Sequence, residues 1–199
     1  MQTACCCLKK HKIRFIIKKI LNLRYNLMDT KDLLKDSFLS LYDKYGYDKI
    51  TVKNVCEKAH VARSTFYFYY QNINEVKEEI ENDTIKNVRL YCENIYSDDF
   101  ESQFFRTMDY IKESKVFYVF LVKQPNAFFI EKFKNEIIKH FEDNFNTNKN
   151  SKNYALELEL FASAIITYYT YYLKHPNETD LDNISVKVKK IRDLIKLFI

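Results

Sequence analysis

The side chains best suited to chemistry lie close together between Thr51 and Tyr70. A guanidinium at Arg63 is followed directly by the hydroxyls of Ser64 and Thr65, at the start of a predicted helix. A helix N-terminus offers free backbone N–H groups to phosphate oxygens, while an arginine fork and short hydroxyls can reach the edges of bases. This pattern predicts binding in a DNA groove. The residues expected to contact DNA are Thr51, Arg63, Ser64, Thr65, Tyr67 and Tyr69.

Two short helices joined by a turn must position these side chains. Thr51 is a favourable N-cap for the first helix, whose apolar residues recur at i, i+3, i+4 and i+7. The turn is His60-Val61-Ala62, and in the second helix Phe66 and Tyr70 share one face that can dock inward. In a helix-turn-helix the second helix reads the major groove with its N-terminal residues. A plain helical hairpin within a bundle is the alternative interpretation.

This stretch resembles the N-terminal domain of the TetR/AcrR family of transcriptional regulators. The resemblance covers about Thr30 to Val76, roughly a quarter of the chain. It implies an all-α homodimer, with a three-helix DNA-binding domain followed by a helical domain for effector binding and dimerisation. The residues that carry it are Gly46-Tyr47, Thr51-Val52, Val55, Ala59, Val61, Ser64-Thr65-Phe66-Tyr67 and Tyr69-Tyr70.

Three positions depart from the family pattern. His60 stands where the turn glycine is usual, so we expect histidine in a backbone conformation that glycine adopts more readily. Ala62 replaces the usual capping Ser or Thr, and Ile73 replaces the usual Lys at the start of the next helix. Both changes weaken phosphate anchoring. An alternative function is therefore a protein-interaction or co-activator subunit that has kept this scaffold without specific DNA reading.

The composition excludes several classes of site. With one glycine and two prolines in 199 residues, the chain lacks the material for phosphate-binding loops, dinucleotide fingerprints and nucleophile elbows. Its four histidines are far apart and its five cysteines, three of them adjacent, do not have metal-ligand spacing. We therefore expect an all-helical cytoplasmic binding protein with no catalytic residues, no metal and no cofactor.

The positive charge is concentrated at the start of the chain. Residues 1–28 carry seven bases and no acid, so the remainder of a chain of net charge +5 sums to −2. This basic extension could be a membrane-surface helix, an arm on DNA, or translation from a start upstream of Met28. The expected organisation is this extension (1–28), a DNA-binding domain (29–75) and an effector-binding and dimerisation domain (76–199).

Helical periodicity extends along both expected domains. A first helix runs from Thr30 to Tyr45, and Gly46 follows it where a left-handed C-cap is required. A long helix follows the two helices of the helix-turn-helix, from about Val76 to Tyr96. Its first half is acidic and is expected to be a solvated face. The acids are Glu75, Glu78, Glu79, Glu81 and Asp83.

The C-terminal half predicts further helices and a dimer interface. Residues 116–122 have strand-like propensity, but no other strand is available to pair with them, so a short helix is expected. Residues 146–153 are polar and predict a loop. Residues 154–173 are apolar around most of a helix, which predicts burial on two sides, but are too few to span a bilayer. Together with 181–199 they are expected to form a four-helix dimer interface.

Aromatic residues dominate the C-terminal half, and the chain contains 16 Tyr and 16 Phe. Such residues with a few hydroxyls can line an apolar cavity for a small-molecule effector, although ordinary core packing is the alternative. We expect a homodimer that represses transcription from a palindromic DNA operator and responds to this effector. The candidate effector-binding residues are Phe104, Met108, Tyr110, Phe117, Tyr118, Phe128, Tyr168 and Tyr172.

Overall fold

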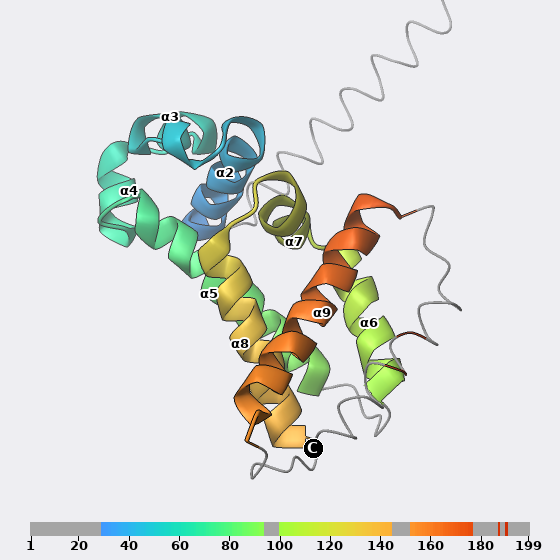
Figure 1. Ribbon diagram of the computed structural model, residues 1–199. Helices are drawn as coiled ribbons and strands as arrows, with labels where there is room; N and C mark the ends of the chain where they lie inside the picture. Colours follow the sequence, from blue (N-terminus) through green and yellow to red (C-terminus); the bar gives the residue numbers. More distant parts are fainter. Residues whose placement is uncertain (1–28, 94–99, 145–151, 177–186, 188–189, 191–199) are drawn as a thin grey trace, which may run out of the picture. The chain divides into compact units, whose positions relative to one another are not determined.

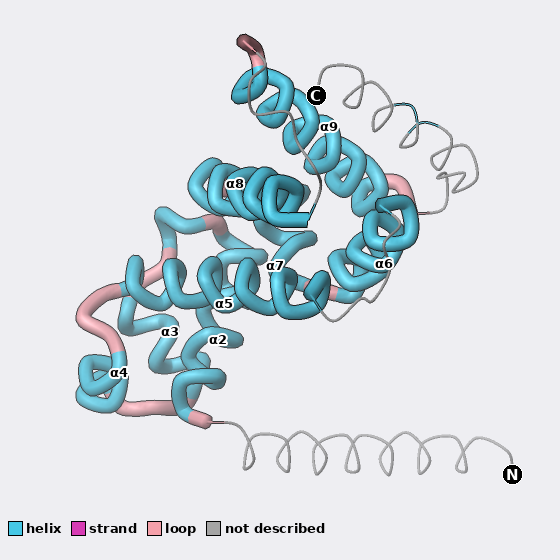
Figure 2. Tube along the Cα trace, turned by 90° about the horizontal axis from the view of Figure 1, so that it is seen from below, coloured by secondary structure: helices cyan, strands magenta, loops and turns pink. Residues whose placement is uncertain are grey.

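The computed structural model describes residues 29–93, 100–144, 152–176, 187 and 190. Every regular element within these ranges is helical, which confirms the predicted all-α class (Figures 1 and 2). No helix in the described part of the chain is both long enough and apolar enough to cross a membrane. The elements are α2 (Thr30–Tyr45), η1 (Tyr47–Lys49), α3 (Val52–Ala59), α4 (Arg63–Tyr69), α5 (Ile73–Glu93), α6 (Phe100–Glu113), α7 (Lys115–Tyr118), η2 (Val119–Lys123), α8 (Ala127–Asn144) and α9 (Tyr154–Lys174).

Three predicted segments lie outside the described residues. They are the basic extension at 1–28, most of the predicted loop at 146–153, and the predicted last helix at 181–199 apart from residues 187 and 190. The other predicted helices correspond to described ones. The predicted long helix from Val76 to Tyr96 corresponds to α5, which begins three residues earlier, at Ile73.

The described residues divide into two compact units. The first contains residues up to Leu41 together with Tyr47–Lys77, and the second contains Tyr42–Gly46 and the chain from Glu78 onward. The division at Lys77 lies two residues beyond the end of the expected DNA-binding domain, at position 75. Helices α2 and α5 each contribute residues to both units.

The first unit is built around the α3-turn-α4 pair (Figure 2). Thr51 caps α3: its hydroxyl accepts the Asn54 backbone N–H at 3.2 Å, and the Asn54 side chain accepts the Thr51 N–H at 2.9 Å. This reciprocal capping box satisfies two of the free donors at the helix start. The core of the unit is apolar, and its fully or nearly fully buried residues are Leu34, Phe38, Val55, Cys56, Ala59, Phe66, Tyr70 and Val76.

The turns between these helices confirm three expectations. Gly46 ends α2 with φ of 76°, and His60 ends α3 with φ of 57° and ψ of 38°, so both are left-handed. Histidine tolerates this conformation at a cost that glycine does not incur. Ala62 occupies the N-cap of α4 and makes no side-chain capping bond. The backbone N–H groups of Thr65 and Phe66 bond to its carbonyl instead, at 3.1 and 3.2 Å.

The acidic first half of α5 is only partly solvated. Glu78 is exposed as expected, but Glu81 is 1% exposed, so the prediction of a solvated face was wrong at this position. Glu81 accepts hydrogen bonds from the Asn126 amide at 2.7 Å and the Lys132 ammonium at 2.8 Å. A buried carboxylate requires such partners, and both come from residues about 50 positions away in the sequence. Sequence periodicity on α5 alone could not show them.

The core of the second unit is an aromatic cluster. Phe117, Phe120, Phe129 and Phe133 are each at most 1% exposed, and the ring centroids of Phe117 and Phe133 lie 5.0 Å apart. The predicted helix at 116–122 is confirmed, in two parts: α7 leads directly into η2, which is a π-helix. The wider π turn changes the angular position of the residues that follow it. Helices α8 and α9 pack side by side along this core (Figure 1).

Candidate functional site

The first residues of helix α4 point outward, while two buried aromatic rings anchor the helix in the first unit. Phe66 is fully buried and Tyr70 is 3% exposed, so this face is anchored in the first unit. Arg63 and Ser64 are exposed, as is Tyr67 at 58%, on the remaining surface of the helix. The predicted inward docking of Phe66 and Tyr70 is thereby confirmed, and the helix N-terminus is available to a large ligand.

The other predicted contact residues lie around this helix. Thr51 is exposed at the start of α3, where its hydroxyl already accepts one capping bond. Thr65 and Tyr69 are half-buried on α4. The structure thus gathers five of the six predicted residues on one short helix and places Thr51 at the N-terminus of the helix before it.

One exposed residue on α4 was missed by sequence reasoning. Phe68 is 80% exposed and contacts the ring of Tyr69 edge-on, with centroids 4.9 Å apart. The sequence pattern led to no predicted role for this apolar side chain. The available signal was its position, since Phe68 lies off the face that Phe66 and Tyr70 define in a 3.6-residue period.

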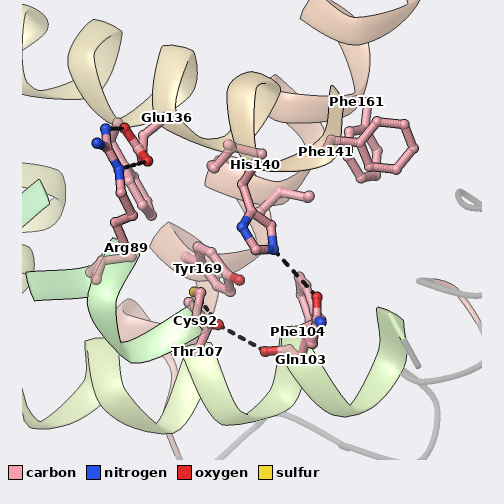
Figure 3. Close-up of a pocket in the computed structure, with 14 residues that line it drawn as sticks. Arg89, Cys92, Gln103, Phe104, Thr107, Glu136, His140, Phe141, Phe161 and Tyr169 are labelled. Atoms are coloured by element: carbon pink, nitrogen blue, oxygen red, sulfur yellow. Dashed lines mark hydrogen bonds and ion pairs between the residues drawn. The ribbon is translucent and has the colours of Figure 1, made fainter. Parts of the chain in front are cut away.

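A cavity of about 70 Å³ lies in the second unit among four helices (Figure 3). Its walls are mainly aromatic and aliphatic. Helix α5 contributes Val88, Arg89 and Cys92; α6 contributes Gln103, Phe104 and Thr107; α8 contributes Phe133, Glu136, Ile137, His140 and Phe141; and α9 contributes Phe161, Ile165 and Tyr169.

The polar side chains of this cavity interact with one another. Two guanidinium nitrogens of Arg89 donate to the two carboxylate oxygens of Glu136, a bidentate pair that joins α5 to α8. The Cys92 sulfur and the Thr107 hydroxyl oxygen are 3.4 Å apart, and so are His140 Nε2 and Gln103 Oε1 (Figure 3). The cavity therefore contains one ion pair whose two charges neutralise each other. Its other polar side chains include a group on α6 and α8.

Burial favours the neutral form of three titratable groups of the cavity, His140, Cys92 and Tyr169. It lowers the pKa of His140, against the opposing effect of the carboxylates of Glu136, Asp143 and Glu93. Burial also raises the pKa of the Cys92 thiol and of the Tyr169 phenol. Each shift favours the neutral form, as expected where desolvation is the largest cause.

The shifted pKa of His140 predicts a pH dependence of stability. The folded protein binds a proton on this imidazole less readily than the unfolded chain, so stability is lost as the pH falls below the unfolded pKa of about 6.5. Urea unfolding at pH 7.5 and 5.5 should therefore show a larger loss for the wild type than for His140→Gln. Equal losses in the two proteins would contradict the neutral assignment.

Only one of the eight candidate effector-binding residues lines this cavity. It is Phe104, which stacks on Tyr169 with centroids 5.1 Å apart. Tyr118 and Phe128 are 43% and 74% exposed, and Phe117 belongs to the aromatic core. The remaining four, none of which lines the cavity, are Met108, Tyr110, Tyr168 and Tyr172. Composition identified the aromatic character of the region but not the residues that surround the space.

Comparisons with known proteins agree with the helix-turn-helix. Residues 39–80 match the family model described as bacterial regulatory proteins of the tetR family. Over 123 residues the chain is 27% identical to the HTH-type dhaKLM operon transcriptional activator DhaS of Lactococcus lactis subsp. lactis (strain IL1403). That match covers 60% of this chain and 64% of the relative, so it spans less than two thirds of the relative's length.

Solved structures share the fold over most of the chain. The dihydroxyacetone kinase operon activator DhaS matches with a TM-score of 0.54 and 21% identity, covering 85% of this chain and 97% of its own. A TetR transcriptional regulator from Streptococcus agalactiae 2603V matches with a TM-score of 0.66 and 17% identity, covering 89% and 98%. SmeT, in complex with triclosan, matches with a TM-score of 0.57 and 11% identity, covering 81% and 89%.

The helix-turn-helix geometry, the match of residues 39–80 and the shared helical fold lead to one assignment. The predicted resemblance to the TetR family of transcriptional regulators is confirmed: residues 39–80 match the family model, and the chain shares the helical fold of solved TetR-family structures.

Proposed function

We propose that this protein is a dimeric, ligand-responsive regulator that binds a palindromic operator through α3 and α4 and acts in the cytoplasm. The observation that carries the proposal is the arrangement of α4, whose aromatic anchors are buried while Arg63, Ser64 and Tyr67 are exposed. A reading helix needs this division, because one face must be fixed to its domain while the other enters the groove.

Each exposed group of α4 has a role that its chemistry supports. The Arg63 guanidinium suits the two acceptors on a guanine edge, and the hydroxyls of Ser64 and Thr65 suit base edges or phosphates. Tyr67 and Tyr69 offer phenolic donors to the phosphate backbone. Phe68 has no polar atom in its side chain, and its 80% exposure suits contact with a thymine methyl group.

The proposed dimer interface includes an exposed face of α9. Leu156, Leu160 and Tyr171 are 59%, 63% and 52% exposed, at positions that follow the helical period along one side. The predicted second interface helix, 181–199, lies outside the described residues. Two-fold pairing would present two α4 helices to half-sites about 34 Å apart, one turn of duplex.

The cavity of the second unit is the proposed effector site. SmeT, which shares this fold, is in complex with triclosan. Helix α5 contributes Val88, Arg89 and Cys92 to the cavity wall and also begins in the first unit. A ligand can control DNA binding only if its affinity differs between the conformations that bind and do not bind the operator.

An operator-binding measurement tests the proposal. We expect the purified protein to prefer a palindrome from its own promoter over random duplex at about 0.15 M salt, measured by gel shift. Equal affinity for both duplexes would contradict it. The sequence predicts repression, whereas DhaS is named an activator. A reporter fused to the bound promoter, with and without the protein, decides the direction of regulation.

Arg63 is expected to supply much of the sequence preference. Arg63→Ala should weaken operator binding by about 1–3 kcal/mol, the discrimination that a bidentate base contact gives. Arg63→Lys is the matched control, because it keeps the positive charge and loses the planar fork. Lysine should restore binding to random duplex but not the preference for the operator, as measured by fluorescence anisotropy. Full restoration of that preference would show that Arg63 contacts phosphate alone.

A second candidate function is a protein-interaction or co-activator subunit. The observation in its favour is the missing side-chain cap at Ala62 and the apolar Ile73 at the start of α5, positions where phosphate anchoring was expected. Under this function the protein would show no operator preference in the gel shift. It would instead associate with a different regulatory protein.

A further inference from the structure

The walls of the cavity determine what kind of surface a ligand must present. Phe104, Phe133, Phe141 and Phe161 surround the space together with aliphatic side chains. The rings of Phe141 and Phe161 lie 4.7 Å apart at one end of it (Figure 3). A water molecule finds few hydrogen-bond partners in such surroundings. An apolar ligand bound there is removed from solvent, which favours its binding.

The charges of the cavity argue against an ionic ligand. Among the described residues that line it, Arg89 and Glu136 are the only Lys, Arg, Asp or Glu, and they form a bidentate pair with each other. A carboxylate or phosphate would have to displace Glu136 from Arg89, and an ammonium would have to displace Arg89 from Glu136. Transfer of an unpaired charge from water into an apolar site is strongly unfavourable.

Hydrogen-bonding groups are present on one side of the space. His140 Nε2 and Gln103 Oε1 are 3.4 Å apart, longer than the usual 2.9–3.0 Å, and both side chains border the cavity (Figure 3). A neutral imidazole and an amide each contain a donor and an acceptor. A ligand hydroxyl can therefore bond to both residues without the cost of a charge.

The volume limits the size of the ligand. A cavity of about 70 Å³ exceeds the roughly 10–15 Å³ required for one water molecule. It is smaller than the engineered cavity of about 150 Å³ that takes up benzene. We therefore expect a ligand of one ring, which requires small rotations of the surrounding side chains.

We propose that the effector cavity takes an uncharged, single-ring aromatic molecule with one hydroxyl group, which bonds to Gln103 and His140 while the ring lies against the phenylalanines. This rests on the proposed function, which makes the cavity the effector site, and it adds the chemical class of the ligand. Phenol is the simplest probe of this class.

The test compares phenol with three relatives in NMR titrations of the full-length protein without DNA. Benzene lacks the hydroxyl, benzoate adds a negative charge, and 2-naphthol adds a second ring. We expect phenol to bind roughly two- to tenfold more tightly than benzene, the effect of one net hydrogen bond. Benzoate and 2-naphthol should each bind at least about tenfold more weakly than phenol. Benzoate binding as tightly as phenol would overturn the proposal.

Gln103→Leu separates the hydroxyl contact from the rest of the site. Leucine is close to glutamine in size, and Gln103 is half-buried, so the fold should tolerate the change. The preference for phenol over benzene should shrink in this variant. Phe128→Ala, a change at an exposed position outside the cavity, should not alter this preference. An unchanged preference in Gln103→Leu would contradict the proposed orientation.

These binding measurements and the operator gel shift fail independently. Loss of phenol binding with intact operator preference would refute the ligand class and leave the regulator function standing. Phenol binding without operator preference would refute the regulator function and leave the ligand class standing.

Discussion

Replacing Phe129 by alanine should lower the free energy of unfolding by about 3–5 kcal/mol. Phe129 is fully buried, and its ring centroid lies 5.3 Å from that of Phe117 and 5.1 Å from that of Phe120. The substitution removes the apolar area of the ring and leaves a cavity that its rigid neighbours cannot fill. The resulting loss is a large fraction of the stability of a typical domain.

The preceding residue provides a matched control. Phe128 is on the same helix and is 74% exposed, so Phe128→Ala should change the free energy of unfolding by no more than about 0.5 kcal/mol. Urea unfolding followed by circular dichroism, at one fixed protein concentration, measures both variants. Similar losses in the two variants would contradict the described orientation of α8. A selective effect of Phe128→Ala on effector binding would support the prediction that Phe128 contacts the effector.

Replacing Lys132 by methionine should cost about 3 kcal/mol of stability, the lower end of the range for breaking a buried ion pair. The Glu81 side chain is 2% exposed and the Lys132 side chain 37% exposed. Methionine keeps most of the apolar stem but removes the ammonium group that pairs with the buried carboxylate. The more exposed lysine is the informative residue to change, because its loss leaves the buried charge in place.

A double variant tests this cause. Glu81→Gln combined with Lys132→Met removes the charge while Asn126 keeps an oxygen to which it can donate. Stability should then return to within about 1 kcal/mol of the wild type. Lys139→Met, at an exposed position on α8, is the control and should have little effect. If the double variant is as unstable as Lys132→Met, the loss does not arise from the buried carboxylate.

The Glu81 cluster also bears on the cavity. Glu81 is on α5 and Lys132 on α8, the two helices that contribute Arg89 and Glu136 to the cavity wall. The cluster and the Arg89–Glu136 pair therefore hold the same two helices at two points along their lengths. In Lys132→Met we expect weaker phenol binding as well as lower stability.

Local rules were sufficient for the DNA-reading pair. The capping residue Thr51, the apolar period of α3 and the pair Phe66 and Tyr70 predicted where both helices lie and which face is buried, and the structure confirms this. These signals each lie within a single short helix and its cap. The roles of the exposed residues in DNA contact remain predictions.

The same local rules explain the all-helical class. A chain with a single glycine has few positions for the tight turns of a sheet, and that residue is used at the left-handed end of α2. The strand-like segment 116–122 became helical for a related reason, since a strand without a partner leaves its backbone groups unpaired. Fold class therefore followed from composition and periodicity.

Only the tertiary structure decided the role of each of many similar side chains. The sequence alone determined that the second unit would be rich in buried aromatic rings. It did not determine that Phe104 lines the cavity, that Phe117 lies in the core and that Phe128 is exposed. The sequence also predicted that Glu81 is solvent-exposed, like the other acidic residues of α5. Contacts between different helices settled these cases, because burial and charge pairing depend on which helices meet, and helical periodicity carries no information about that.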